Sequence, residues 1–159
     1  MNWRDYLEYN NGDLCWRTDR GSNKLKGLKA GSVDSNGYVL IKLNGKKHRA
    51  HRIVLEIYNG PIPCKMEIDH INHVKTDNRI ENLRLVDHVT NGRNKSQYGN
   101  NKSGATGVSW DSNQNKWFAQ ITVKSKNIRL GYFLNFSDAV NARKLAEIQY
   151  GFHENHGLI

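Results

Sequence analysis

The chain has 159 residues, of which 37% are hydrophobic, and its mean hydropathy is −0.76. This length suits one or two small domains rather than a large enzyme fold, and no stretch approaches the roughly 20 apolar residues of a membrane-spanning helix, so we expect no membrane protein. Lysine and arginine together number 24 against 15 acidic residues, so the net charge is +9. Such an excess is typical of proteins that bind a polyanion, most often nucleic acid, with an ordinary basic protein as the alternative.

The N-terminal residues lack the apolar core of a signal peptide. The two cysteines, Cys15 and Cys64, are too few for a disulfide framework or for a four-thiolate zinc site. We therefore expect a cytoplasmic protein in which both thiols are small packing residues.

The N-terminal part of the chain predicts a series of short elements. Asn44-Gly45 lies between two runs that contain apolar residues, which is a strong signal of a β-hairpin. The helical spacing that begins at Ile53 stops at Asn59-Gly60-Pro61. In chain order we expect a short helix (1–10), a short strand (14–17), a basic loop (18–36), a hairpin (38–50) and a helix (53–58).

Beyond residue 105 the pattern changes to alternating apolar residues. Ala119 and Ile121 alternate with Phe118 and Gln120, as in a strand with one buried face. Here we expect strands at 107–110, 116–123 and 128–133, then a helix from the N-cap Ser137 to near Gly151.

A stretch rich in Gly, Ser and Asn at 96–105 predicts a flexible linker between two folded parts. We therefore expect a first domain at 1–98 with its motif core at 48–97, a linker at 99–105, and a second domain at 106–155.

Between residues 61 and 101 the chain is polar and places a carboxylate beside an imidazole, at Asp69-His70, with carboxamides further on. Phosphodiester hydrolysis needs a base that takes a proton from water and a cation that stabilises the leaving oxygen. Asp69 offers a hard oxygen ligand, and the Asn82 carboxamide can accept a hydrogen bond from one imidazole nitrogen and so leave the other free as a base. A polar surface loop whose side chains cap turns is the alternative.

Four segments of this region stand out: Ala50-His51-Arg52-Ile53-Val54, Glu67-Ile68-Asp69-His70-Ile71, Asn78-Arg79-Ile80-Glu81-Asn82-Leu83 and Asn91. Together they resemble the HNH endonuclease family, in particular the homing and freestanding nucleases of bacteriophages. The resemblance implies a ββα-metal fold, in which a two-stranded hairpin and a helix hold one divalent cation.

The same resemblance implies the roles of the site residues. His70 is the catalytic base, Asn82 orients it, and Asp69 and Asn91 are metal ligands. Asn91 is assigned by spacing, and Asn94 is the alternative. Because Asp69 and Asn91 offer only oxygen atoms, the expected cofactor is one Mg²⁺ or Mn²⁺ ion per active site.

Segments Gly107–Trp110, Lys116–Ile121, Arg129–Phe133 and Ala139–Ala142 resemble the ethylene-response-factor DNA-binding domain. That family lays a three-stranded sheet in the major groove and packs a helix behind it. The resemblance and the strand alternation together predict a DNA-contacting face of six residues: Ser109, Phe118, Gln120, Thr122, Asn127 and Arg129. Near Asn91, we expect Arg93 and Lys95 to contact the phosphate backbone, with solvated charges as the alternative.

The sequence thus predicts an α+β protein with an HNH nuclease region followed by a sheet–helix DNA reader. We expect it to hydrolyse double-stranded DNA, as a monomer that nicks rather than as a dimer, and in the host cytoplasm if a phage encodes it. Nothing in the sequence indicates a protein partner. The alternatives are a non-catalytic DNA-binding regulator and, less favoured by a sheet that reads B-form DNA, a nuclease that acts on RNA.

Overall fold

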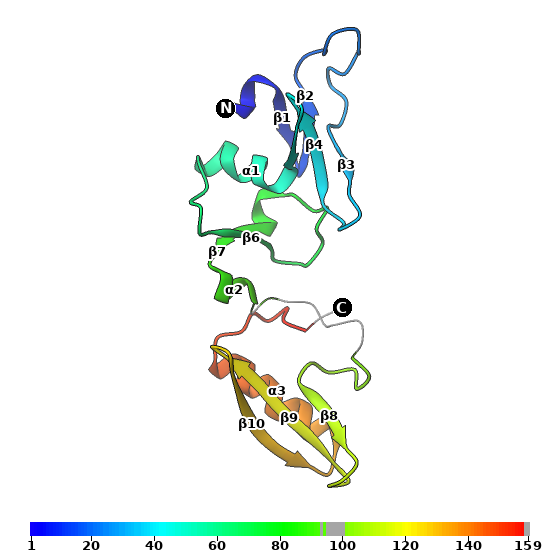
Figure 1. Cartoon of the computed structure of the whole chain (residues 1–159), viewed down its shortest axis with the longest axis vertical. Helices are drawn as coiled ribbons and strands as arrows, with labels where there is room; N and C mark the ends of the chain where they lie inside the picture. The colour runs from blue at the N-terminus through cyan, green and yellow to red at the C-terminus, as the bar shows by residue number, and fades with distance from the viewer. Residues whose placement is uncertain (93, 95–100, 158–159) are drawn as a thin grey trace. The chain divides into compact units, whose positions relative to one another are not determined.

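The computed structural model describes residues 1–92, 94 and 101–157, and the chain divides into two compact units, Met1–His88 and Val89–Ile159 (Figure 1). The boundary lies ten residues before the end of the predicted first domain at 98. Of the expected linker at 99–105, residues 99 and 100 lie outside the described residues, and 101–105 belong to the second unit, where the Ser103 hydroxyl donates to the Val108 carbonyl at 2.6 Å. Small antiparallel sheets and few helices make up both units, so the predicted α+β class is confirmed.

The first unit contains three small antiparallel sheets, with strand orders β1-β2, β3-β4-β5 and β6-β7. Its elements are η1 (Trp3–Asp5), β1 (Leu7–Asn10), β2 (Asp13–Trp16), β3 (Ser32–Val33), β4 (Val39–Leu43), β5 (Lys46–Arg49), α1 (Ala50–Asn59), β6 (Glu67–His70), η2 (Ile80–Asn82) and β7 (Leu83–Val86).

Local turn chemistry sets the hairpins of this unit. Asn44 and Gly45 have φ angles of 51° and 77°, and they join β4 to β5 as predicted. The helix predicted for residues 1–10 is wrong, because only one 3-10 turn forms before β1. Asn11 and Gly12, with φ angles of 43° and 95°, reverse the chain so that β1 pairs with β2. This pairing overrides the weak helical pattern.

One hydrophobic core holds the first unit together. The α1 side chains Ile53 and Val54 are fully buried together with Ile41 and Leu43 of β4. Leu83 at the start of β7 joins the same core. The strand that carries the predicted catalytic histidine therefore pairs with a strand that is anchored in the core.

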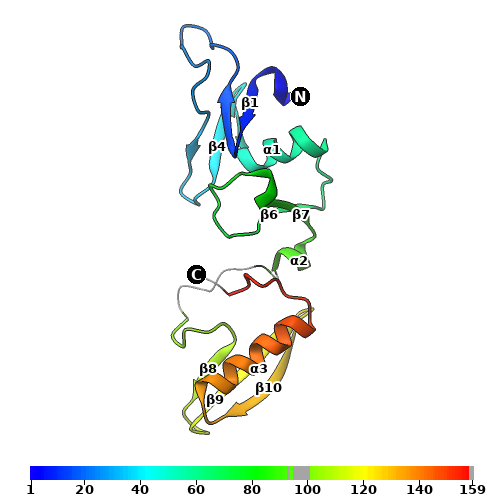
Figure 2. The same cartoon turned by 180° about the vertical axis from the view of Figure 1, so that it is seen from behind.

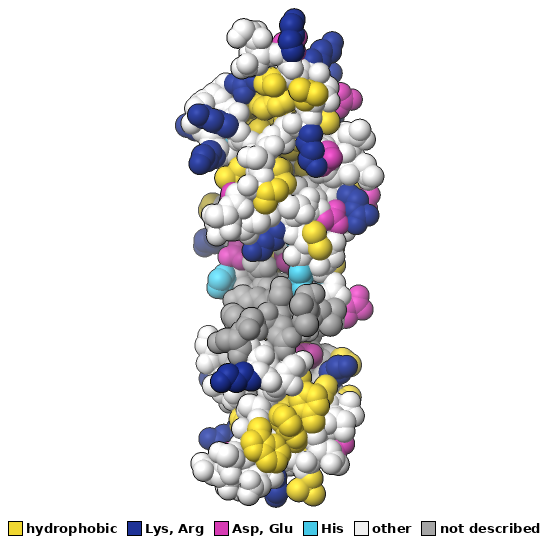
Figure 3. Space-filling model, turned by 90° about the vertical axis from the view of Figure 1, so that its right-hand side faces the viewer, with side chains coloured by type: hydrophobic (Ala, Val, Ile, Leu, Met, Phe, Trp, Pro, Cys, Tyr) yellow, Lys and Arg dark blue, Asp and Glu magenta, His cyan; other side chains and the backbone are white. Residues whose placement is uncertain are grey.

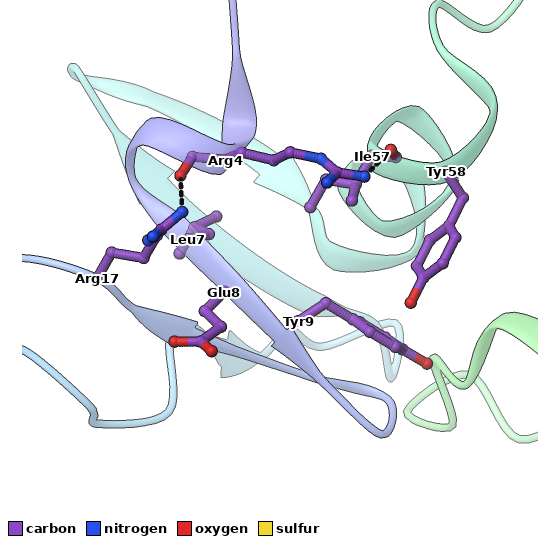
Figure 4. A pocket seen from close by; sticks show the side chains of 7 residues that line it. All are labelled: Arg4, Leu7, Glu8, Tyr9, Arg17, Ile57 and Tyr58. Carbon is purple, nitrogen blue, oxygen red and sulfur yellow. Dashed lines mark hydrogen bonds between the residues drawn. The ribbon is translucent and has the colours of Figure 1, made fainter.

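A pocket of about 340 Å³ opens beside β1 and α1 (Figure 4). Arg4 donates a hydrogen bond to the Ile57 carbonyl (3.0 Å), and Arg17 donates one to the Arg4 carbonyl (2.9 Å). The rings of Tyr9 and Tyr58 meet edge to face, with centroids 5.3 Å apart. None of the lining residues is a predicted catalytic or metal-binding residue, so this pocket is not the candidate active site.

The second unit is a three-stranded antiparallel sheet of order β10-β9-β8 with one long helix. Helix α3 lies behind the sheet in Figure 1 and in front of it in Figure 2, so it covers one face. Asn135, and not the predicted Ser137, is the N-cap, because α3 begins at Phe136. The elements are α2 (His88–Gly92), which begins in the first unit, β8 (Val108–Asp111), β9 (Lys116–Val123), β10 (Lys126–Phe133) and α3 (Phe136–Gln149).

Exposed hydrophobic side chains occur on both units. On the face that Figure 3 shows, the second unit carries a continuous hydrophobic patch, and Lys and Arg side chains are spread over the first. Trp110, Leu145 and Ile148 are among the exposed apolar residues of the second unit. Among the described residues, no helix is both long enough and apolar enough to span a membrane.

Candidate active site

Strand β6 ends in the two residues that the motif singled out. Asp69 and His70 are 7% and 5% exposed, although both are polar. Alternation along a strand directs neighbouring side chains to opposite faces. The His70 ring meets His51 of α1, with centroids 5.1 Å apart, whereas Asp69 pairs with Arg84 of β7. The two adjacent residues therefore have separate surroundings and can have separate tasks.

The Asp69 carboxylate is held by a charge-assisted contact across the β6-β7 hairpin. Its Oδ2 atom accepts hydrogen bonds from Arg84 Nε at 2.9 Å and from Arg84 Nη2 at 2.7 Å. Contacts of this kind are stronger than neutral hydrogen bonds. The buried carboxylate is thus charge-compensated and held in one orientation.

His70 is oriented by Asn78, a residue that the sequence reasoning missed. Asn78 is 2% exposed, and its Oδ1 lies 3.2 Å from His70 Nε2. Because Asn78 Nδ2 donates to the Thr76 carbonyl (3.4 Å), its oxygen faces the ring. We therefore assign the proton to Nε2, which makes Nδ1 the basic nitrogen. Burial lowers the pKa of His70 below its usual 6.5, against the opposing effect of Asn78, so the ring is neutral at pH 7.

Asn82 does not make the contact that we predicted for it. Its Oδ1 accepts from the Asn72 backbone N–H at 3.0 Å, and its Nδ2 donates to the Asp77 carbonyl at 2.8 Å. Asn82 thus holds together the two ends of the loop that joins β6 to β7. Both Asn78 and Asn82 lie in the recognised segment, and spacing alone did not distinguish which of them faces the ring.

Asp77 in this loop is paired with Arg79 through contacts of 2.7 and 2.8 Å. Hydrogen bonding to Arg79 holds the pKa of Asp77 well below its usual range, and the same contact raises the pKa of Arg79. The loop thus carries an ionised carboxylate whose charge is largely balanced beside His70.

His51 lies in the first turn of α1, and its ring packs against that of His70. It is 6% exposed, and burial lowers its pKa to about 3, helped by repulsion from His70 once that ring is protonated and by the charges of Arg49 and Arg52. Its Nδ1 is buried without a hydrogen-bond partner among the described residues. The Tyr38 ring packs edge to face on it, with centroids 5.2 Å apart. His51 is therefore a neutral buried residue, and does not stand on the surface as a phosphate contact would.

The predicted metal ligands lie on both sides of the boundary between the units. Asp69 belongs to the first unit, whereas Asn91 lies half-buried in α2 and belongs to the second. The alternative Asn94 is 3% exposed, and its N–H donates to the Asn91 carbonyl at 3.2 Å. In the ranges that the structure describes, no group of three His, Cys, Asp or Glu side chains is placed to hold a metal ion.

The available donors still suit the predicted ion. Mg²⁺ takes oxygen ligands and is usually bound through one or two carboxylates, with water and substrate phosphate filling the remaining positions. Asp69 is a buried carboxylate, and Asn91 offers a carboxamide oxygen. Oxygen donors of these two kinds suit Mg²⁺ or Mn²⁺ better than an ion that prefers sulfur or imidazole.

The strand register of the second unit places the predicted DNA-contacting residues on one face of the sheet. Gln120 lies opposite Arg129, and Thr122 lies opposite Asn127, to which its hydroxyl donates at 2.6 Å. The third row of this face is Ser109, Phe118 and Tyr132.

Tyr132 is 46% exposed, its ring centroid lies 5.0 Å from that of Phe118, and the sequence reasoning missed it. Strict alternation from Asn127 and Arg129 would place Tyr132 on the inner face of the strand. The register shift between Arg129 and Gly131 brings it opposite Phe118 instead, and the sequence pattern does not show this shift. The two other predicted DNA contacts, Arg93 and Lys95, lie outside the described residues.

Comparison with known proteins places the site in a family. The sequence model of the family described as HNH endonuclease matches residues 48–93. Protein 3.8 of Escherichia phage T7 is 36% identical over 81 residues, which are 51% of this chain and 67% of that protein. The solved structure of the HNH homing endonuclease I-HmuI, described as showing DNA binding and cleavage, is similar with a TM-score of 0.43 and 22% identity. That likeness covers 56% of this chain and 51% of the other, about half its length.

The chain belongs to the HNH endonuclease family, and the matched segment contains Asp69, His70, Asn78 and Asn82. Its similarity to Protein 3.8 links it to a phage-encoded relative.

Proposed function

We propose that this protein is a metal-dependent endonuclease that hydrolyses phosphodiester bonds of double-stranded DNA. The observation that carries the proposal is the buried, neutral His70, held by Asn78 and adjacent to the buried carboxylate of Asp69, within the segment that matches the HNH family. Burial of such groups is costly unless they are partnered, and groups with perturbed pKa values gather at functional sites.

In this proposal His70 is the general base. Its Nδ1 takes a proton from water, and the resulting hydroxide attacks the phosphorus atom. The bond from phosphorus to the leaving sugar oxygen breaks, and that oxygen takes up a proton from solvent. Asn78 acts by holding the ring in the tautomer that leaves Nδ1 basic. The lowered pKa keeps the base unprotonated at neutral pH.

Asp69 and Asn91 are the proposed ligands of a single Mg²⁺ or Mn²⁺ ion, with Asn94 as the alternative to Asn91. The chemistry that such an ion supplies is neutralisation of the charge on the scissile phosphate and on the leaving oxygen. The role of Arg84 is to hold the Asp69 carboxylate in place through Oδ2.

We further propose that the second unit reads DNA through the exposed face of its sheet. The likeness to the ethylene-response-factor domain and the shared face of Gln120, Thr122, Asn127 and Arg129 support this role. A single active site per chain favours a monomer that nicks one strand, and the phage source of the relative favours an enzyme that works inside an infected cell.

The test is cleavage of a supercoiled plasmid by the purified full chain with Mg²⁺, with Mn²⁺ and with EDTA. We expect conversion to the nicked form with either ion and none with EDTA. Retention of the plasmid in a binding assay without any cleavage would instead identify a DNA-binding regulator that has lost the chemistry. Sequencing of the cut ends then shows whether one strand or both are cut.

A further inference from the structure

Tyr38 lies next to the candidate catalytic histidine and to two cationic side chains. The centroid of its ring is 6.0 Å from that of His70. Arg49 Cζ lies 4.4 Å from the centroid of the Tyr38 ring, and Lys75 Nζ lies 5.0 Å from it. Both distances are within the range of cation–π contacts. One aromatic ring therefore gathers two positive charges beside His70.

The turn before β4 fixes the position of this ring. Asp34 Oδ1 accepts hydrogen bonds from the backbone N–H groups of Asn36 and Tyr38, each at 2.9 Å. The Tyr38 carbonyl accepts from Asp34 N–H at 2.8 Å, and Gly37 supplies the positive φ of 84° that the turn requires.

Lys75 of the β6-β7 loop is attached to the same turn. Its Nζ donates to the Asn36 carbonyl at 3.0 Å. Its Cδ lies 3.6 Å from the position of a Cβ built on Gly37, so the aliphatic part of the side chain packs against this glycine. Arg49 comes from a third element, the end of β5. Three segments that are distant in sequence thus deliver the ring and the two cations to one place.

Neither cation has an acidic partner within the described part of the chain. Arg49 and Lys75 are both exposed, and no ion pair joins either of them to a carboxylate there. The nearby Asp34 carboxylate bonds backbone N–H groups, and Asp69 and Asp77 form ion pairs with arginines of their own. Two positive charges held against one ring without a counter-charge raise the local positive potential, which favours an anion.

We propose that Arg49 and Lys75 form a phosphate-binding site that holds the DNA backbone at or beside the bond that His70 attacks, with Tyr38 as the residue that positions both cations. This inference rests on the proposed nuclease function. The guanidinium of Arg49 offers a planar fork that matches phosphate oxygens, and the ammonium of Lys75 adds a compact charge. The ligand is a phosphodiester, so the site adds affinity and alignment without reading sequence.

The test compares two double variants of the full chain that lose the same charge. Arg49→Ala/Lys75→Ala removes the proposed site, whereas Lys46→Ala/Lys65→Ala removes two exposed lysines outside the Tyr38 cluster. The probe is one duplex DNA, for which Kd is measured over a range of salt concentrations and kcat and KM are measured for cleavage.

We expect the first double variant to lower kcat/KM by at least about 10-fold relative to the lysine control. The slope of log K against log salt should fall by about 0.9 for each phosphate contact that is lost. Equal slopes and equal kcat/KM in the two double variants, with an active wild type, would overturn the inference and leave the nuclease intact. If the wild type does not cut DNA but the two double variants still differ in salt slope, the proposed nuclease function is wrong and the phosphate site is retained.

Tyr38 supplies the second arm of the experiment. Tyr38→Phe keeps the ring and should keep the wild-type salt slope and kcat/KM, whereas Tyr38→Leu should reproduce the loss seen for the cation variant while His70 remains in place. If Tyr38→Leu does not fold, as judged by circular dichroism, the comparison of the two double variants still decides. A folded Tyr38→Leu protein with the wild-type slope would show that the ring does not position the cations.

Discussion

The two units bury polar side chains for different purposes. Around the β6-β7 hairpin, the first unit buries His51, Asp69, His70, Asn78 and Asn82, and these residues mostly face one another or the loop between the strands. Among its described residues the second unit buries Asn94 and Arg143, and Arg143 joins helix to sheet.

Arg143 shows what a structural polar residue looks like. It projects from α3, donates to the Gln120 carbonyl of β9, and pairs with Glu147 at 2.8 Å within its own helix. Gly107 leaves room for it, because a Cβ at that position would collide with the guanidinium and with the Gln120 oxygen. All of these contacts hold the fold together. The residues proposed to contact DNA lie instead on the exposed face of the sheet, whereas the proposed base and its neighbours are buried in the first unit.

The strongest test of whether the reaction site lies in the first unit is to remove the proposed base. His70→Ala should lower cleavage by at least about 100-fold, the usual scale for loss of a general base, while DNA binding stays within a few-fold of wild type. Single-turnover cleavage and fluorescence anisotropy on the same duplex measure the two effects. His88, whose side chain is 87% exposed, is the matched control, and His88→Ala should cleave normally. Near-normal cleavage by His70→Ala would show that His70 is not the base and that the reaction site is assigned to the wrong residues.

Asn78 and Asn82 test the division within the buried cluster itself. Asn82→Ala removes two hydrogen bonds that close the loop, so it should lower the free energy of unfolding by about 1–3 kcal/mol, measured by urea denaturation. Asn78→Ala should act on His70, with a shifted pH profile of kcat/KM, because the ring loses the acceptor that fixes its tautomer. If Asn82→Ala shifted the profile and Asn78→Ala did not, our original assignment of Asn82 would be restored.

The elements that the sequence predicted best are those set by local chemistry. The β4-β5 hairpin follows from Asn44-Gly45, and the eight residues of β9 have the predicted bounds because apolar and polar residues alternate along them. The prediction failed for residues 1–10, where a tertiary pairing between β1 and β2 decides the structure. It also failed at Ser137, because the turn after β10 places the helix start earlier.

Of the candidate site, too, the sequence predicted the parts that depend on local patterns and missed those that depend on tertiary contacts. Adjacent Asp69 and His70 could be found from residue types and spacing, and the structure buries both. The choice between Asn78 and Asn82 depends on the path of the loop, which spacing does not specify. The contacts of Tyr38 with His51 and His70 join β4, α1 and β6, and no sequence period links residues so far apart.

Arg129 tests the recognition surface of the second unit. If it reads a guanine, Arg129→Ala should weaken binding by about 1–3 kcal/mol and relax one position of the target site. If it contacts only phosphate, binding should fall equally for all sequences, with a smaller salt slope. Selection of binding sites from a random duplex library, together with Kd values, separates these results. Lys144, exposed on α3, is the charge-matched control. No effect of Arg129→Ala beyond that of Lys144→Ala would remove this part of the sheet from the interface.

The smallest expected effect concerns pH and the buried histidines of the first unit. Burial lowers the pKa of His51 from 6.5 to about 3. Between pH 6.5 and pH 3, His51 is therefore protonated in the unfolded chain but not in the folded one. Stability therefore falls as the pH drops below about 6.5, by at most about 1.4 kcal/mol per pH unit for this one group. The lowered pKa of His70 acts in the same direction.

His51→Leu isolates this contribution. The variant also removes the unpartnered Nδ1, so it should be close to wild type in stability at pH 7 and more stable than wild type at pH 5. Urea unfolding at pH 7, 6 and 5 measures how stability depends on pH in the variant and in the wild type. A His51→Leu protein with the wild-type slope would show that the acid sensitivity does not come from this histidine.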